Sequence, residues 1–297
     1  MSHPASSSPW GDLRKGLAFL SPWLIGFCVF TAAPILMALY FSFCDYGITD
    51  EPLWVGLGNY RELMSDKDFW NALSVTGRYA LMALPAGMCV SLGLAILLNQ
   101  PIRSQAIYRT IIFLPSLVPV AAAAMIWFWL FNTKLGLINY VLALIGIKPI
   151  GWLTNPSVAL PALAFMSLWG VGHTVVIYLA ALQDVQKDLY EAAELDGASG
   201  WRRMWHVTLP MISPVIFFNL IIAIIGVFRV LDLPYIMTNG GPAGATQFIA
   251  LYLYQMSFMF VRTGYASAMA FIMLLIILFL TALAFWTSRR WVHYQSK

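Results

Sequence analysis

Six long apolar segments dominate this chain of 297 residues. They extend over approximately residues 17–43, 72–98, 107–131, 159–182, 209–233 and 266–287. A helix needs about 20 apolar residues to cross the ~30 Å hydrocarbon core of a bilayer, and every segment is long enough. Charged residues make up only 10% of the chain, whereas soluble domains average about 25%. The sequence therefore predicts an all-α membrane protein with six transmembrane helices.

The first apolar segment lies where a secretory signal would lie, but it is too long for one. Arg14 and Lys15 precede it, and no convincing small-residue cleavage site follows it. We therefore expect a retained first span. Pro22 near its start and Pro34 inside it predict a kink.

The distribution of lysine and arginine predicts the orientation of the spans, because cytoplasmic loops carry an excess of both. With the N-terminus in the cytoplasm, the inside segments hold ten basic residues: Arg14, Lys15, Arg103, Arg109, Lys187, Arg202, Arg203, Arg289, Arg290 and Lys297. The outside segments hold five: Arg61, Lys67, Lys134, Lys148 and Arg262. We therefore expect cytoplasmic tails at residues 1–16 and 288–297, a transmembrane domain at 17–287, and a cytoplasmic loop at 183–208.

The loop at residues 183–208 carries the signals of a short helix. Asp188 can cap its N-terminus, and Glu191, three residues later, can reach back to the cap as in a capping box. Gly197 supplies the left-handed residue with which helices commonly end. Taken alone, these signals also suit a surface connector that lies among the lipid headgroups.

The fifth apolar segment carries signals at both ends. Thr208 or Leu209 can cap its helix, with Pro210 in the first turn, where a missing N–H costs nothing. Near the outer end, Arg229 and Asp232 are three residues apart, so they share a helix face and can pair. Charges in a span are costly and usually functional. The two residues are therefore either a structural ion pair near the outer interface or part of the polar lining of a solute path.

The order of residues in the loop is more specific than its helix signals. Glu-Ala-Ala at 191–193 is followed by Gly197 and then by Val-Thr-Leu-Pro at 207–210. This pattern resembles the EAA loop of ATP-binding-cassette (ABC) importer permeases, where the loop is a coupling helix that docks in a groove on the ATPase subunit. The resemblance implies the type I ABC importer permease fold. It assigns ATPase coupling to Glu191, Ala192, Ala193, Asp196, Gly197, Leu209 and Pro210.

Three further segments resemble maltose-type sugar permeases. They are Val-Gly-Leu-Gly-Asn-Tyr at 55–60, Thr-Asn-Gly-Gly-Pro at 238–242 and Gly-Tyr-Ala-Ser-Ala at 264–268. In that family the sugar lies halfway across the membrane, between helices that match spans three to six. Only Gly170 matches a sugar-contacting residue of the maltose protein. The side chains and positions that could form a solute path here are Gly170, His173, Asn219, Arg229, Asp232 and Trp169, with Trp127 and Trp129 as further aromatic faces.

Each of these path residues also has an ordinary interpretation. A membrane tryptophan is commonly an interfacial anchor or a packing residue. His173 is commonly a buried histidine whose hydrogen bonds are satisfied. If Arg229 faces the path, an anionic sugar or sugar phosphate is favoured, because a guanidinium binds carboxylate or phosphate through two hydrogen bonds. Arg78, in the second span, offers another cation or lies at the outer interface.

The resemblance implies a set of partners. They are a second homologous permease subunit, two copies of an ATP-binding subunit, an extracytoplasmic solute-binding protein and a sugar substrate, in a bacterial or archaeal cytoplasmic membrane. The chain has no Gly-x4-Gly-Lys-Ser/Thr phosphate loop, so we expect ATP and Mg²⁺ to bind the partner ATPase and no cofactor to bind here. It also lacks sequence motifs for hydrolytic catalysis or metal ligation, so no catalytic or metal residue is assigned. Nothing in its charge pattern suggests nucleic acid.

Three other functions remain compatible with parts of the sequence. An ion-gradient-driven secondary transporter would need acids at mid-membrane, but Asp232, near an outer end, is the only acid in the spans. A scaffold or receptor would use the loop merely to bind a soluble partner. An ABC importer of a non-sugar solute, such as a phosphorylated polyol, would share every feature above except the sugar.

Overall fold

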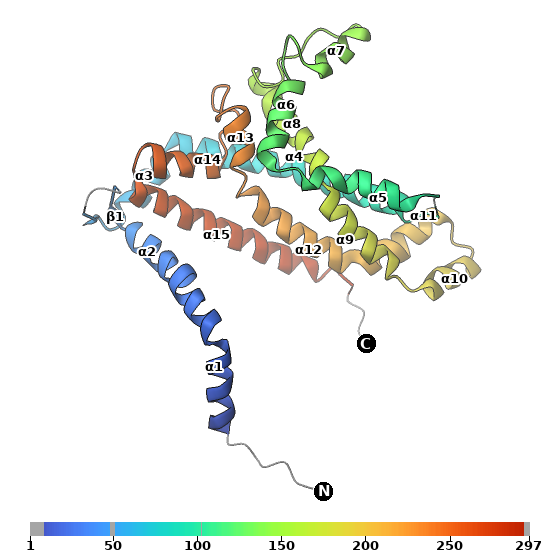
Figure 1. The fold of residues 1–297 in the computed structure, drawn as a ribbon, viewed down its shortest axis with the longest axis horizontal. Helices are drawn as coiled ribbons and strands as arrows, with labels where there is room; N and C mark the ends of the chain where they lie inside the picture. Colours follow the sequence, from blue (N-terminus) through green and yellow to red (C-terminus); the bar gives the residue numbers. More distant parts are fainter. Residues whose placement is uncertain (1–8, 48–50, 102, 294–297) are drawn as a thin grey trace. The chain divides into compact units, whose positions relative to one another are not determined.

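The computed structural model describes residues 9–47, 51–101 and 103–293, and the described part is built almost wholly of helices (Figure 1). Short 3-10 or π-helical segments are labelled η. In chain order the elements are α1 (Pro9–Phe27), η1 (Cys28–Ala32), α2 (Ala33–Phe41), β1 (Cys44–Asp45), β2 (Leu53–Trp54), α3 (Gly58–Ser65), α4 (Lys67–Leu98), α5 (Gln105–Phe113), η2 (Leu114–Leu117), α6 (Val120–Leu130), α7 (Leu137–Leu144), α8 (Pro156–Ser167), η3 (Leu168–Gly170), α9 (Gly172–Gln183), α10 (Lys187–Leu195), α11 (Gly200–Arg203), η4 (Met204–Thr208), α12 (Leu209–Val227), α13 (Asp232–Met237), α14 (Ile249–Tyr254), η5 (Gln255–Met259) and α15 (Thr263–Ser288).

The chain divides into two compact units. One comprises the residues up to Ser65 together with Met256–Ile272, and the other comprises Asp66–Gln255 together with Met273–Lys297. In the described residues, four helices are long and apolar enough to cross a membrane, and two bent helix pairs raise the number to six if each pair is one span. The six-span prediction is therefore confirmed, with two of the spans broken.

The first span belongs to the first unit and runs from Lys15 to Ser42. No part of its most apolar stretch is buried. The kink predicted at Pro22 and Pro34 stays a prediction, but Pro34 follows the π-helical segment η1, where the Ala33 N–H donates to the Cys28 carbonyl, five residues back. A π turn immediately before a proline makes room for a ring that would clash with a regular α turn.

The rest of the first unit is a loop tied to the start of α15. Strands β1 and β2 pair antiparallel, and the Asn59 amide donates to the Cys44 carbonyl oxygen at 2.8 Å. A side chain on Gly264 would collide with that same carbonyl, so only glycine fits there. Arg262 and Glu62 form an ion pair at 2.6 Å, and its hydrogen bond raises the pKa of Arg262 above its ordinary value. The described residues 44–47 and 51–65 are thus held in place by backbone and side-chain hydrogen bonds.

Spans two and six agree closely with the sequence. The second span is α4, which begins at Lys67, because the Asp66 carboxylate caps it by accepting from the Asp68 N–H at 2.8 Å. The sixth span is α15, of which residues 273–288 belong to the second unit. In that unit α4 packs along α8, α9 and α12.

Spans three and four are each broken, which the hydropathy pattern does not reveal. The third bends by 95° between η2 and α6, and the fourth bends by 51° between η3 and α9. Pro115 and Pro119 explain the first bend, because each removes a backbone donor and its ring disfavours a continuing α turn. At the second, the chain passes through Gly170 and Gly172. As a result α6 and α8 form a projection that carries α7 at its tip (Figure 1).

Two apolar clusters hold the second unit together. One joins α4 to the projection and includes Tyr79, Trp127 and Phe248. The other lies near the opposite end of α4 and includes Leu98, Tyr178 and Ile212. The loop at residues 183–208 emerges from the second cluster, because Leu182 and Val185 belong to it.

Candidate functional site

The helix predicted in the loop at residues 183–208 exists as α10, but it begins differently from the prediction. Gln186 is the N-cap residue, and no side chain caps the helix. Asp188 lies in the first turn, so the predicted capping box with Glu191 is wrong. The reason is packing, because the buried Val185 sets the point at which the chain leaves the core. Asp188 still lies where a negative charge favours a helix.

The predicted end of the helix is confirmed. Gly197 has a φ of +75°, in the left-handed region. The Ala198 N–H donates to the Ala193 carbonyl at 2.9 Å, and the Gly197 N–H donates to the Glu194 carbonyl at 3.0 Å. These two bonds form a Schellman motif, which satisfies carbonyls that the helix end leaves open. The chain therefore turns sharply at Gly197.

The fifth span does not begin at Thr208 or Leu209, as predicted, but at Gly200. Ser199 caps it by accepting from the Arg202 N–H, and the helix is continuous to Val227. Pro210 lies inside this longer helix, directly after the π-helical η4, where the Leu209 N–H donates to the Met204 carbonyl. As at Pro34, the π turn accommodates the ring, so no new start is needed.

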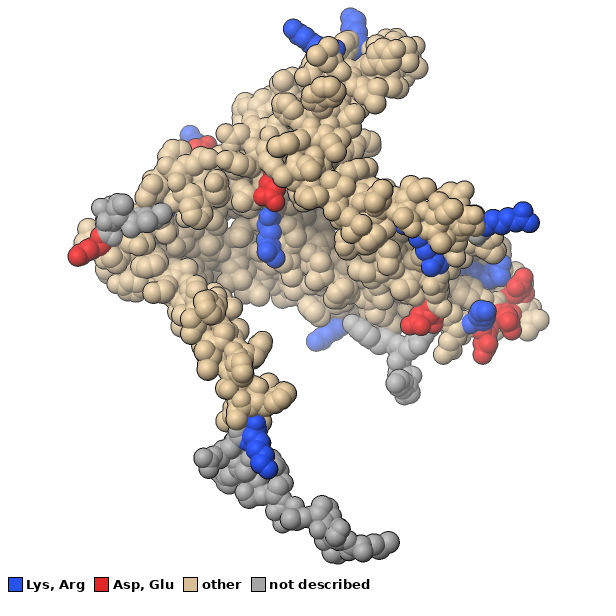
Figure 2. Space-filling view, viewed as in Figure 1, with Lys and Arg blue, Asp and Glu red and all other residues tan. Residues whose placement is uncertain are grey.

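Charged residues gather on the exposed end of the second unit formed by α10 and α11. Figure 2 shows acidic and basic side chains together there, whereas the spans are almost uncharged. No residue of α10 is buried, and Glu191, Ala192 and Asp196 are exposed. Arg203 pairs with Glu194 at 3.3 Å. The candidate coupling residues on α10 are therefore accessible to another protein.

Three large apolar side chains accompany these charges, and the sequence analysis did not identify them. Leu195 is 90% exposed, Trp201 72% and Trp205 53%. The two tryptophan rings meet edge to face with their centroids 5.8 Å apart. Their spacing of four residues on one helix was the available signal.

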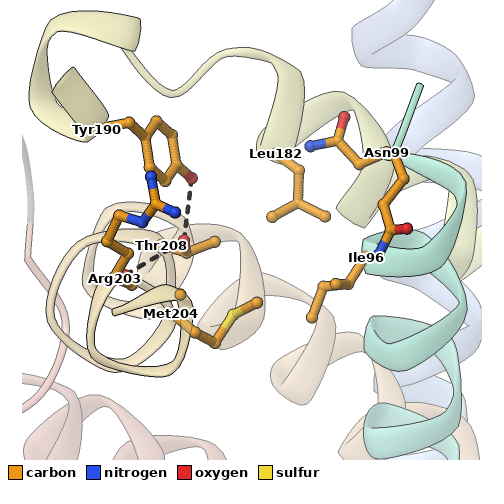
Figure 3. A pocket seen from close by; sticks show the side chains of 9 residues that line it. Ile96, Asn99, Leu182, Tyr190, Arg203, Met204 and Thr208 are labelled. Carbon is orange, nitrogen blue, oxygen red and sulfur yellow. Dashed lines mark hydrogen bonds between the residues drawn. The ribbon is translucent and has the colours of Figure 1, made fainter. Parts of the chain in front are cut away.

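A cavity of about 250 Å³ lies beneath α10 (Figure 3). Ile96 comes from the end of α4, Asn99 and Gln100 directly follow it, and Leu182 comes from α9. The other lining residues are Tyr190, Gly200, Arg203, Met204 and Thr208. The Tyr190 hydroxyl lies 3.0 Å from Thr208 Oγ1, which links α10 to the fifth span.

The candidate path residues of the fourth span lie near its bend. Trp169, Gly170 and His173 are exposed. His173 is therefore not the buried histidine of the ordinary interpretation. Its ring lies against that of Phe113, with the two ring centroids 5.0 Å apart. Nothing approaches within 4 Å of where a side chain on Gly170 would lie. Trp169 contacts the buried Trp127 edge to face.

The candidate path residues of the fifth span do not form one polar lining. Asn219 is buried, and its amide donates to the Val215 carbonyl one turn back. Arg229 follows the end of α12, whereas Asp232 begins α13. The two are exposed and form no ion pair in the described structure, so the predicted pairing on one helix face is wrong. The cause is that the helix ends at Val227.

The residue that shapes the fourth span is Gly172, which the sequence analysis missed. A Cβ there would lie 2.8 Å from the Ile112 carbonyl oxygen and 2.9 Å from the Phe113 Cα. Spans three and four therefore touch through their backbones at this point. Close approach at glycine is common between membrane helices.

A family model for the binding-protein-dependent transport system inner membrane component matches residues 84–293. The permease YesP of Bacillus subtilis, a probable ABC transporter permease protein, is 40% identical over 291 residues, covering 96% of this chain and 94% of that protein. The sulfoquinovosyl glycerol transport permease SmoG of Agrobacterium fabrum is 32% identical and covers 92% of this chain and 89% of SmoG.

One solved structure has the same fold. A bacterial ABC transporter involved in the import of the acidic polysaccharide alginate aligns with a TM-score of 0.81 at 24% identity, covering 95% of this chain and 98% of the aligned one. The family match covers the broken spans, the loop at residues 183–208 and the last helix. The chain therefore belongs to the inner membrane components of binding-protein-dependent transport systems, the permease subunits of ABC importers.

Proposed function

We propose that this chain is the permease subunit of an ATP-driven importer of a sugar or sugar derivative, and that a partner ATPase grips α10. Solute crosses by alternating access. ATP closes the ATPase dimer, α10 follows, and the spans open outward to receive solute from an extracytoplasmic binding protein. A partner that binds one state more tightly shifts the equilibrium toward it. The chain itself hydrolyses nothing and binds no cofactor, with ATP and Mg²⁺ in the ATPase.

The observation that carries this proposal is the surface of α10 and α11. Exposed acids, among them Glu191 and Asp196, lie beside Leu195, Trp201 and Trp205. Aromatic and apolar residues with charges around them are typical of a protein interface. A connector among headgroups would carry mainly basic residues, but α10 carries Asp188, Glu191 and Glu194 against Lys187.

The assembly proposed around the chain follows from the family. It contains a second homologous permease, two copies of the ATPase and the solute-binding protein, in a bacterial or archaeal cytoplasmic membrane. Both termini and α10 are proposed to face the cytoplasm. Membrane-impermeant labelling of single cysteines at Ser199 and Tyr140, in a variant without the three native cysteines, should modify only the second position in intact cells.

The sugar class is supported by SmoG, whose name states a sulfoquinovosyl glycerol transport system. Trp169 and His173 lie exposed near the bend of the fourth span and offer an aromatic face and hydrogen bonds to a solute. Gly170 leaves the space beside them open. We propose that these three residues contact the solute, with Asn219 supporting the fifth span.

A second candidate substrate is a phosphorylated polyol or another anionic solute. The exposed guanidinium of Arg229, which forms no ion pair in the described structure, favours it. Asp232, also exposed, would repel an anion if it lies beside the path. A panel of maltose, lactose and sn-glycerol 3-phosphate, each radiolabelled and presented with the partner binding protein, should distinguish neutral from anionic solutes.

The proposal is tested by purifying the chain with the products of its neighbouring genes and reconstituting the complex in liposomes. An ATPase should co-purify, and ATP should drive accumulation of one member of the panel. Glu191→Ala should weaken ATPase binding and uncouple ATP hydrolysis from uptake, whereas Glu51→Ala, in an exposed external loop, should do neither. Uptake that survives Glu191→Ala unaltered would refute the role given to α10.

A further inference from the structure

In the described residues, two polar contacts join α10 to the fifth span. Glu194 and Arg203 pair at 3.3 Å, and the Tyr190 hydroxyl meets Thr208 Oγ1 at 3.0 Å. The Glu194 side chain is 71% exposed, so water screens the ion pair and makes it weak. Thr208 is only 5% exposed, and the Tyr190 ring packs against the apolar cluster beneath. The hydroxyl pair is therefore the firmer of the two contacts.

The hydrogen bonds at Thr208 have a direction. Thr208 Oγ1 donates to the Arg203 carbonyl at 3.4 Å. A hydroxyl has one proton to give, so while Thr208 donates to this carbonyl, the Tyr190 hydroxyl is the donor to Thr208. A chain of two hydrogen bonds then runs from α10 into the backbone of the fifth span.

That chain ends at an irregular part of the fifth span. Thr208 closes the π-helical segment η4, and Pro210, which has no N–H, follows it within the helix Gly200–Val227. Helices bend most readily at π turns and prolines. If Tyr190 transmits a displacement of α10, the force therefore acts at η4 and Pro210, where the helix of the fifth span bends most readily.

A cavity of about 250 Å³ lies beside the hydroxyl pair. Figure 3 shows Tyr190 and Thr208 hydrogen-bonded to each other on one side of this cavity, with Ile96 and Asn99 on the other side. Because side chains do not fill the space on that side, packing against the end of α4 does not hold the pair in place there.

We propose that Tyr190 and Thr208 are positioning residues that transmit the movement of α10 to a hinge at η4 and Pro210 in the fifth span. This inference rests on the proposed function and names the joint through which coupling passes. When the ATPase moves α10, the hydrogen-bonded pair makes the fifth span move with it. Without the pair, α10 moves alone, and ATP is hydrolysed without transport.

The test uses the complete reconstituted transporter and the radiolabelled panel member that the wild type accumulates. Tyr190→Phe and Thr208→Val each remove one hydroxyl and keep the shape of the side chain. Each should lower the solute transported per ATP by about three- to tenfold, the equilibrium effect of one lost hydrogen bond. The double variant should be no worse than the poorer single one, because both remove the same bond.

Three comparisons separate this role from a merely structural one. Thr208→Ser keeps the hydroxyl and should restore the ratio of solute to ATP. Tyr140→Phe, at an exposed tyrosine of α7, and Thr110→Val, on α5, should leave it unchanged. ATPase co-purification and the unfolding temperature should be the same in all variants. An unchanged ratio of solute to ATP in either single variant would refute the proposed role of the pair. So would effects of the two substitutions that multiply in the double variant. A wild type that binds no ATPase would instead refute the proposed function.

Discussion

The candidate coupling loop, residues 183–208, and the candidate solute path differ in how their residues are brought together. The coupling loop is built by consecutive residues from Gln186 to Thr208, with a Schellman motif at Gly197 as its main turn. The path residues come from the bend of the fourth span and from both sides of the break after Val227. The loop therefore depends on local backbone chemistry, whereas the path depends on where helices break and how closely they pack.

Two glycines in the fourth span allow the path to be tested first, and the largest effect is expected there. Gly172→Ala should destabilise the protein by about 1–3 kcal/mol, because overpacking against the backbone of Ile112 and Phe113 forces the helices apart. Gly170→Ala, two residues away in open space, should change stability by less than about 0.5 kcal/mol. Thermal unfolding of the purified protein measures both. Equal effects would show that spans three and four do not touch at Gly172.

The matched glycine pair in the coupling loop should give a smaller and more local effect. Gly197→Ala should cost about 1–2 kcal/mol at the end of α10, because alanine is strained at a φ of +75°. Gly200→Ala meets no neighbour within 4 Å and should be nearly neutral. Because α10 buries no residue, the cost should appear as faster hydrogen exchange at residues 193–198, with little change in the global unfolding temperature. A large global change would mean that α10 belongs to the folding core.

The same contrast explains which features the sequence could predict. The six spans and the turn at Gly197 follow from hydropathy and from the conformational freedom of glycine, both of which are local. The start of α10 was misplaced because Val185, buried in the core, outweighs the capping preference of Asp188. The start of the fifth span was misplaced because η4 lets the helix continue through Pro210.

The path could be predicted only in part. Trp169, Gly170 and His173 do lie together near a bend, but the bend itself depends on the contact of Gly172 with Ile112, sixty residues earlier in the chain. No local pattern distinguishes Gly170, which is open, from Gly172, which is packed. The exposure of Trp201 and Trp205 likewise depends on the direction that the chain takes after Gly197.

The charges of the coupling loop should contribute less than its glycine. Glu194→Gln and Arg203→Gln, measured singly and together, should show a coupling energy of about 0.2–1 kcal/mol, as expected for an exposed pair. The value should fall as salt is raised toward 1 M, where the Debye length is about 3 Å. A coupling energy that does not change with salt would indicate that the pair is shielded from solvent.

The charges of the path give the smallest expected effect. A helix continuing through residue 232 would place Arg229 and Asp232 on one face, where an ion pair contributes about 0.2–0.5 kcal/mol. The observed helix ends at Val227, and the two side chains form no ion pair in the described structure. The cycle of Arg229→Gln, Asp232→Asn and the double variant should therefore give a coupling energy near zero, measured by chemical unfolding at low salt. A clearly favourable value would mean that the fifth span continues to Leu233, and the division of the path between α12 and α13 would be wrong.

If the Arg229 guanidinium binds the solute, Arg229→Gln should alter uptake of sn-glycerol 3-phosphate more than uptake of maltose.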